Sequence, residues 1–195
     1  ERRRVTPPTQ EARLAFSSGK YYSDVMAGNV FIGSTAAAGT AFPISTGTAV
    51  TFGLWNTSTT KNAVLIDLDV GVTSGIIALG MLGIANQYCG FALATAAPLS
   101  AFTDGTPKNA KAGTGAASSM RFTPSAATLT AGGTALKWLG KSIESATAGL
   151  GIFDGHYEFD GKVIVPPGQL VFVCGSVAQT ALFTMSMTWA ELDIG

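Results

Sequence analysis

The chain offers few side chains that could carry out chemistry. Its single histidine, His156, precedes Tyr157 and Glu158 in a stretch that we expect to be a strand. One histidine, without a Cys-x-x-Cys or His-x-x-x-His pattern, supplies no ligand set for a catalytic zinc ion. A Ser-His-Asp triad would have to use the same histidine, and no G-x-S-x-G motif is present to position its serine. The sequence therefore predicts a structural or surface role for His156.

Carboxylate pairs are the remaining candidates for acid–base chemistry, because a glycosidase needs only two of them. Asp67 and Asp69 are two positions apart in a predicted strand, which places them about 6–7 Å apart on one face. A second group near a predicted hairpin consists of Asp154, Glu158 and Asp160. The sequence gives no reason for a raised pKa, so we interpret both groups as solvated, with a calcium site or an acid–base pair as the alternative.

Two short motifs match phosphate-binding loops only in part. Gly140-Lys141-Ser142 would need a glycine five residues earlier, where the chain has Ala135. Gly113-Thr114-Gly115 lacks the third glycine and the strand-to-helix context of a dinucleotide fingerprint. We therefore expect a protein that is not an enzyme, has no cofactor and takes no small-molecule substrate.

The positions of the basic residues argue against nucleic acid as a partner. Outside the N-terminal segment these residues are scattered, without the interleaved aromatic side chains of a nucleic-acid-binding patch. They are Lys20, Lys61, Lys108, Lys111, Arg121, Lys137, Lys141 and Lys162.

Charge is scarce in this chain of 195 residues, a length that predicts one domain. Charged side chains make up 12% of it, about half the usual share. Twelve Lys and Arg residues balance 12 Asp and Glu residues, and the mean hydropathy is +0.33. A surface so poor in charge protects weakly against association, so we expect other subunits to cover much of it.

The uncharged segment between Asp69 and Asp104 raises the question of membrane insertion. Residues 76–94 alone are long enough to span a bilayer. Asn86 and Gln87 lie within them, glycines interrupt them, and no flanking Lys or Arg marks an orientation. We therefore predict a buried pair of strands here and no membrane association.

Two other features are expected to be inert. Cys89 and Cys174 each lie in an apolar run, which predicts buried free thiols rather than a disulfide. Asn56-Thr57-Ser58 is a single match to the glycosylation sequon and carries no information alone.

Residues 1–18 are predicted to form an extended N-terminal arm, and residues 19–195 a single β-sandwich domain. The arm begins with charged residues followed by prolines instead of an apolar core, so no signal peptide is expected. Its basic residues would dock it onto a partner. They are Arg2, Arg3, Arg4 and Arg13.

The end of the chain gives the clearest strand pattern. Residues 161–165 and 169–177 are predicted strands on either side of a corner at Pro166-Pro167-Gly168, because proline cannot donate to a sheet ladder. In residues 181–192 every second side chain is large and apolar, which predicts a strand with one buried face. These side chains are Phe183, Met185, Met187 and Trp189.

The rest of the chain supplies the other layer. We expect a strand, a turn and a strand in residues 20–32, and an antiparallel pair of strands from residues 62–73 and 76–84. Alternation places Val64, Ile66 and Leu68 on one face and Leu65 on the other. Further strands are predicted at residues 49–56, from residue 91, and at residues 120–123, 135–143 and 151–159.

Loops and turns separate these strands. Residues 104–119 are predicted as a long polar loop, residues 144–149 as a possible short helix, and Asp160-Gly161 as a hairpin turn. The sum is an all-β, jelly-roll-like antiparallel β-sandwich with an extended N-terminal arm.

The closing pattern carries a resemblance. Asp160-Gly161, then Ile164-Val165-Pro166-Pro167-Gly168, the apolar residues 170–174 and the terminal Thr188-Trp189-Ala190-Glu191 resemble the last strands of phage virion jelly rolls. The overall layout is similar to the trimeric jelly-roll decoration (cement) proteins of tailed-phage capsids. The resemblance implies a homotrimer that binds the major capsid protein, on the exterior of a virion assembled in the host cytoplasm. This chain carries less charge than decoration proteins often do.

Three hypotheses follow. The first is a virion structural protein, most simply a capsid decoration protein that stabilises a phage head. The second is a carbohydrate- or receptor-binding β-sandwich of a tail fibre or lectin-like protein, with Trp55, Trp138 and Tyr157 as sugar-stacking platforms or core residues. The third is a hydrolase that uses Asp67 and Asp69.

Overall fold

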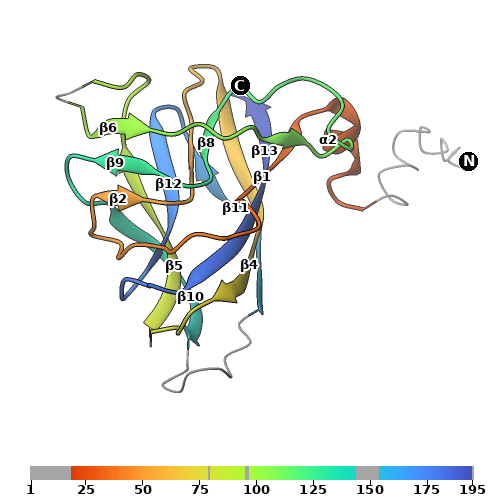
Figure 1. The fold of residues 1–195 in the computed structure, drawn as a ribbon. Coiled ribbons are helices and arrows are strands. Elements are labelled where there is room, and N and C mark those ends of the chain that lie inside the picture. The colour runs from red at the N-terminus through yellow and green to blue at the C-terminus, as the bar shows by residue number, and fades with distance from the viewer. Residues whose placement is uncertain (1–18, 79, 95–96, 144–153, 195) are drawn as a thin grey trace, which may run out of the picture.

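A computed structural model describes residues 19–78, 80–94, 97–143 and 154–194. The arm predicted at residues 1–18, with Arg2, Arg3, Arg4 and Arg13, lies outside the described residues. The helix considered at residues 144–149 does so too. The described chain is nearly all β, and two five-stranded antiparallel sheets pack face to face (Figure 1). The predicted all-β sandwich is confirmed.

The first sheet, sheet A, has the strand order β11-β4-β13-β1-β7. Its strands are β1 (Val30–Ser34), β4 (Lys61–Ser74), β7 (Lys108–Asn109), β11 (Asp154–Val165) and β13 (Leu182–Asp193). The second sheet, sheet B, has the order β10-β5-β12-β3-β8. Its strands are β3 (Gly53–Trp55), β5 (Gly80–Tyr88), β8 (Arg121–Thr123), β10 (Thr134–Ile143) and β12 (Gln169–Gly175).

The strand order is that of a jelly roll. When β7 and β8 at the edges are set aside, eight strands remain in the two sheets. Counted along the chain, they run sixth, third, eighth, first in sheet A and fifth, fourth, seventh, second in sheet B. Every connection but one therefore crosses from one sheet to the other, which rolls the chain into the double-sheet architecture.

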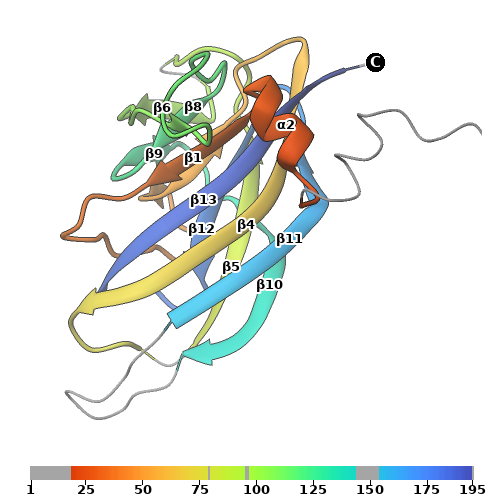
Figure 2. The ribbon, with the colours of Figure 1, turned by 90° about the vertical axis from the view of Figure 1, so that its right-hand side faces the viewer.

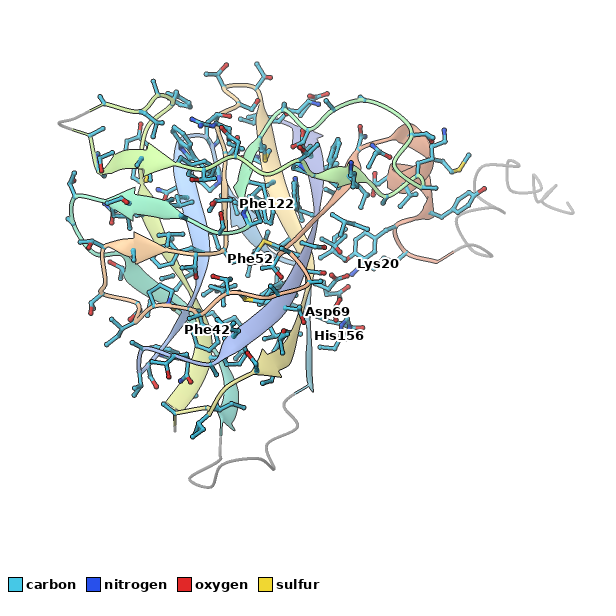
Figure 3. All side chains as sticks on the ribbon, viewed as in Figure 1. Lys20, Phe42, Phe52, Asp69, Phe122 and His156 are labelled. Carbon is cyan, nitrogen blue, oxygen red and sulfur yellow. The ribbon has the colours of Figure 1, made fainter. Side chains whose placement is uncertain are left out.

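The main core lies between the inner faces of the sheets. The large side chains predicted on one face of residues 181–192 are buried there, since none of the four exceeds 2% exposure. Phe42, Phe52 and Phe122 lie among them (Figure 3). The ring of Phe52 meets that of Phe122 edge-on at a centroid distance of 5.1 Å. The alternation in residues 181–192 therefore predicted the buried face of this strand correctly.

Sheet B also has an apolar outer face, covered by a small third sheet, sheet C. Its strands, in the order β2-β9-β6, are β2 (Ala49–Val50), β9 (Ala127–Leu129) and β6 (Leu99–Phe102). A second buried cluster forms between them and includes Trp55, Phe172 and Leu129. Trp55 therefore points away from the main core.

One end of the outer face of sheet A is covered by the helix α2 (Tyr22–Ala27), which lies across the strands in Figure 2. This corrects the strand predicted in residues 20–32, because only β1 is a strand there. Tyr21 and Val25, one helical turn apart, pack on the sheet. The helix ends at Gly28, whose φ of 82° is the left-handed conformation that favours glycine.

The face assignment predicted for residues 62–73 was wrong in part. Leu65 and Leu68 are both in the main core, while Ile66 belongs to the outer cluster under α2. The ladders to β13 and β11 both skip Ile66, which makes it the extra residue of a β-bulge. The bulge reverses which positions face inward on its two sides, so one alternation cannot describe the whole strand.

Three other boundaries differ from the prediction. Asp160 and Gly161 are an irregularity inside β11, with φ of 55° and 75°, rather than a hairpin turn. Residues 80–88 form β5 in sheet B, so they do not pair with β4 in sheet A. Residues 91–94 are loop, not strand, and the predicted buried pair is a single strand. No helix in the described ranges has the length and apolar character needed to cross a bilayer.

The strands β10 and β11 form the open side of the sandwich, each at the edge of its sheet. Both are irregular: the pairing of β10 shifts between Ala135 and Lys137, and that of β11 between Glu158 and Val163. The Lys137 ammonium lies 5.7 Å from the centre of the Phe159 ring, so a side chain of β10 reaches across to β11.

Candidate functional site

A hollow lies on the outer face of sheet A, beside α2. Its lining residues are Lys20, Tyr21, Ile66, Asp67, His156, Glu158 and Asp160. Figure 3 shows Lys20, Asp69 and His156 close together on this side of the molecule.

Pairing of β4 with β11 brings the charged residues together. His156 lies directly opposite Asp69, and Glu158 opposite Asp67. The neighbouring positions Tyr157 and Phe159 face the core, so the charged side chains share the outer face. The two acidic groups that the sequence predicted separately therefore form one cluster.

The histidine forms an ion pair on this surface. His156 Nδ1 lies 2.6 Å from Asp69 Oδ1, and Nε2 lies 3.7 Å from Glu158 Oε1. The hydrogen bond to Asp69 raises the pKa of His156 above its ordinary value. The His156 and Asp69 side chains are 55% and 56% exposed, so solvent screens this pair. His156 therefore lies on the surface, one of the two placements that the sequence predicted.

Asp67 differs from its neighbour Asp69. It is half-buried, and its Oδ1 is buried without a hydrogen-bond partner among the described residues. Burial raises the pKa of Asp67, and the negative charges of Asp69 and Glu158 add to this effect. The prediction of a solvated pair is correct for Asp69 and wrong for Asp67, because the wall of the hollow shields it.

The other end of the hollow is closed by a contact from the start of the described chain. Lys20 forms an ion pair with Asp160, and the Tyr21 hydroxyl donates a hydrogen bond of 3.1 Å to the same carboxylate. These bonds raise the pKa of Lys20 and lower that of Asp160.

The chemistry available to this cluster is limited. Asp69 is bound to His156 and Asp160 to Lys20, which leaves Asp67 as the carboxyl with a raised pKa. Within residues 19–78, 80–94, 97–143 and 154–194, no group of three or more His, Cys, Asp or Glu side chains is arranged to hold a metal ion. The cluster is therefore a network of surface ion pairs, of which His156–Asp69 joins two strands.

The three predicted aromatic platforms have different environments. Trp55 is fully buried and Tyr157 is buried in the main core, so neither can stack on a ligand. Trp138 is 39% exposed on β10 and its indole lies over Gly83 on the outer face of sheet B. Trp138 therefore remains available to a partner.

Trp55 is instead part of a structural stack. The Arg121 guanidinium lies 5.0 Å from the Trp55 ring centre and 4.9 Å from that of Phe102. It donates two hydrogen bonds, of 2.7 and 2.6 Å, to Asp104. This arrangement ties sheet C to sheet B and neutralises the arginine.

Both cysteines are buried free thiols, as predicted, and burial raises the pKa of Cys89 and of Cys174 to about 12. Asn56 of the sequon is fully buried, and its amide donates hydrogen bonds of 2.8 Å to the carbonyls of Lys61 and Val165. Asn56 is therefore a structural residue in the folded chain.

One buried carboxylate was missed in the sequence. Glu191 is 2% exposed and accepts hydrogen bonds from the Ser118 hydroxyl, at 2.5 Å, and from the backbone N–H and hydroxyl of Ser119. The Trp189 indole donates to it at 3.3 Å. Glu191 thus fixes the end of the polar loop at residues 104–119 against β13. The signal available was a glutamate in a strand near an apolar run, which is too weak to predict such a bond.

A second missed feature is an exposed apolar loop. Residues 91–94 (Phe-Ala-Leu-Ala) are all exposed, and Tyr88 just before them is 55% exposed. The sequence signal is the absence of charge between Asp69 and Asp104, but a run without charge also predicts burial, and here that prediction is wrong for residues 91–94.

Comparisons with known proteins return no match to a family model, a curated protein or a solved structure. The functional argument is therefore made from the fold and the surface of this chain. The features available to it are the jelly-roll body, the ion-pair network around His156 and the exposed apolar residues.

Proposed function

We propose that this chain is a structural protein of a phage virion, a capsid decoration protein that stabilises the head. It binds the major capsid protein lattice as a homotrimer on the exterior of the particle, which is assembled in the host cytoplasm. The observation that carries the proposal is the jelly-roll strand order, an architecture used by viral capsid proteins and lectins.

The surface supports adhesion as the task. Charged residues are few and balanced, and large apolar side chains are exposed on several elements. They include Tyr22 and Met26 on α2, Tyr88 at the end of β5, Phe91 after it, and Trp138 on β10. Repeated contacts between symmetric copies would bury such side chains, and no reaction is required of a protein with this role.

The N-terminal arm supplies a second contact in this proposal. Its four arginines, Arg2, Arg3, Arg4 and Arg13, would bind acidic groups of the shell or of a neighbouring copy. Once the body is attached, the arm binds at a high effective concentration and adds avidity.

Cryo-microscopy of the source particle tests the proposal, together with binding of the purified chain to particles stripped of it. We expect density for three copies around a lattice symmetry axis, and weaker binding for a chain that starts at residue 19. A matched control replaces the four arginines with lysine, which keeps the charge. A chain that does not bind any particle would contradict the proposal.

Carbohydrate binding is the second candidate, and one observation favours it. The exposed indole of Trp138 over Gly83 is the kind of flat aromatic surface on which a sugar ring stacks. A glycan array with the wild type and Trp138→Ala tests this function. Binding that depends on Trp138 would favour it, whereas an empty array would exclude the glycans tested.

A further inference from the structure

One end of the hollow on sheet A has more negative than positive charge. This acidic end, defined as Asp67, Asp69 and Glu158, lies on the outer face where β4 pairs with β11. Among the described residues, no Lys or Arg side chain lies within ion-pair distance of these three carboxylates, and their one cationic neighbour is His156. Three carboxylates therefore face a histidine that carries at most one positive charge.

Asp67 shows the effect of this imbalance most clearly. Burial raises the pKa of Asp67, and the negative charges of Asp69 and Glu158 raise it further. A cation bound at this end would stabilise the charged form of all three carboxylates. The arginine guanidinium suits such a position, because it keeps its charge and can donate hydrogen bonds to two carboxylates at once.

The opposite end of the hollow is already neutralised. Lys20 forms an ion pair with Asp160, and the Tyr21 hydroxyl donates to the same carboxylate. The positive charge of Lys162 also helps to lower the pKa of Asp160. This neutral end therefore has no need of a further cation, and it ties the start of the described chain to β11.

The N-terminal arm, residues 1–18, joins the body at the neutral end. The Tyr22 N–H donates to the Gly19 carbonyl at 3.0 Å, so a turn fixes the point from which the arm extends. Arg13 is six residues before Gly19, which allows a separation of about 20 Å. Glu158 is two positions along β11 from the neutral end, about 6–7 Å away. The acidic end is therefore within reach of Arg13.

The arm and the body carry opposite net charges. Residues 1–18 contain four arginines and two glutamates, a net charge of +2. Because the whole chain is balanced, residues 19–195 carry a net charge of −2. The short connection gives Arg13 a higher effective concentration at the hollow than the arginines at residues 2–4, which are at least nine residues farther away.

We propose that the arm folds back on its own chain and that the Arg13 guanidinium docks on the acidic end of the hollow, between Asp67 and Glu158. The contact is intramolecular, so it forms in the free chain without a partner. The acidic groups of a partner must then compete with the hollow for Arg13 before the whole arm can bind them. The inference concerns the free chain and goes beyond the proposed function.

The single histidine of the chain, His156, reports on this contact. A docked guanidinium disfavours the protonated imidazole, because it adds positive charge and competes for Asp69 and Glu158. In a nuclear magnetic resonance titration we expect a lower pKa of His156 in the wild type than in Arg13→Gln. Arg4→Gln removes the same charge farther along the arm and is the matched control, with the pKa of the wild type. The difference should shrink in about 1 M salt, which screens exposed charges.

Removal of the acidic end tests where Arg13 binds. In a chain with Asp67→Asn and Glu158→Gln, the further change Arg13→Gln should leave the pKa of His156 where it is. Circular dichroism checks that this background folds. If it does not, Glu158→Gln alone, at a 77% exposed side chain, takes its place and should reduce the effect of Arg13→Gln.

Mixing tests whether the contact lies within one chain. Isotope-labelled Arg13→Gln keeps an intact acidic end, so unlabelled wild type added to it should leave its His156 pKa unchanged. A change on mixing would place the arm on a second copy and overturn the inference. Equal pKa values in the wild type and Arg13→Gln, or an equal effect of Arg4→Gln, would overturn it too. Particle binding is scored separately: a docked arm on a chain that ignores capsids would contradict the proposed function alone.

Discussion

On the outer face of sheet A a single helix, α2, covers one end of the strands, whereas on the outer face of sheet B a complete third sheet does so (Figures 1 and 2). The cluster under α2 contains three buried residues, Val30, Ile66 and Ala190. The cluster under sheet C contains ten, among them Trp55 and Phe172. The outer face of sheet B therefore lies over a second hydrophobic core, covered by sheet C, whereas the outer face of sheet A is covered only at one end, by α2.

The uncovered parts of the two faces differ less. On sheet A they carry the cross-strand ion pair of His156 and Asp69, which tolerates water, and exposed apolar side chains such as Ile164. On sheet B they carry Trp138 and Met81. Exposed apolar side chains therefore occur on both faces, and the clearest difference between the faces is how each of them is covered. The predictions below test this difference, from the largest expected effect to the smallest.

Trp55→Ala should remove most of the support of the second core. The substitution empties a fully buried site, breaks the bond to the Gly90 carbonyl and removes the surface on which Arg121 stacks. We expect the free energy of unfolding in urea to fall by about 3–5 kcal/mol. Trp138→Ala is the matched control and should cost about 1 kcal/mol or less in the monomer. Equal losses would mean that sheet C does not enclose a core.

Glu191→Ala should weaken the contact between sheets A and B, because Glu191 of sheet A binds Ser118 and Ser119, which come shortly before β8 of sheet B. It leaves the half-buried Ser118 hydroxyl and the buried Trp189 indole without this acceptor, whereas the exposed Ser119 can bond to water, so the cost should be about 2 kcal/mol. Hydrogen exchange at the Ser119 amide should accelerate. Glu158→Ala, at a 77% exposed side chain, should change neither quantity appreciably.

Val25→Ala tests how strongly α2 is docked. Val25 is half-buried against sheet A, so its truncation should lower the free energy of unfolding by about 1 kcal/mol. Met26→Ala, one residue on and exposed, should stay within about 0.5 kcal/mol of the wild type. A loss as large as that of Trp55→Ala would mean that α2 and sheet C contribute equally to the stability of the fold.

His156→Ala should have the smallest effect, and one that depends on pH. The pKa of His156 is raised by Asp69, with Asp67 also contributing and Glu158 in contact, so the protonated form is favoured in the folded state. Its contribution is fully present below the unfolded pKa of about 6.5 and is lost as the pH rises through the folded value. Because the pair is exposed, we expect about 0.5 kcal/mol or less. Thermal unfolding of both proteins between pH 5 and about pH 8 measures it, and a difference that grows with pH would contradict the assignment.

The strands that could be predicted are those with one buried face and no irregularity. Burial alternates from Leu182 to Trp189 because β13 lies in the middle of its sheet with the sandwich core on one side, and the alternation ends at Ala190, which is buried under α2 on the other side. In residues 62–73 the same rule failed at Ile66, because a bulge adds one residue and the sequence does not mark it. Asp160-Gly161 failed for a related reason: residues that favour positive φ suit a bulge as well as a turn.

The site was less predictable than the fold. That Asp67, Asp69 and His156 meet depends on the register between β4 and β11, which are far apart in the sequence. The uncharged run after Asp69 was interpreted as buried throughout, since composition cannot tell a core strand from an exposed loop. The structure divides it, with β5 inside and residues 91–94 outside.

The irregular pairing of β10 and β11 bears on how copies of this chain behave when they are close together. A regular edge strand can pair with the edge strand of another molecule, and crowded proteins can aggregate into fibres through such edges. Here the ladders of both edge strands shift register, and the Lys137 ammonium of β10 lies near Phe159 of β11. These two edges therefore disfavour the addition of a strand from a further copy.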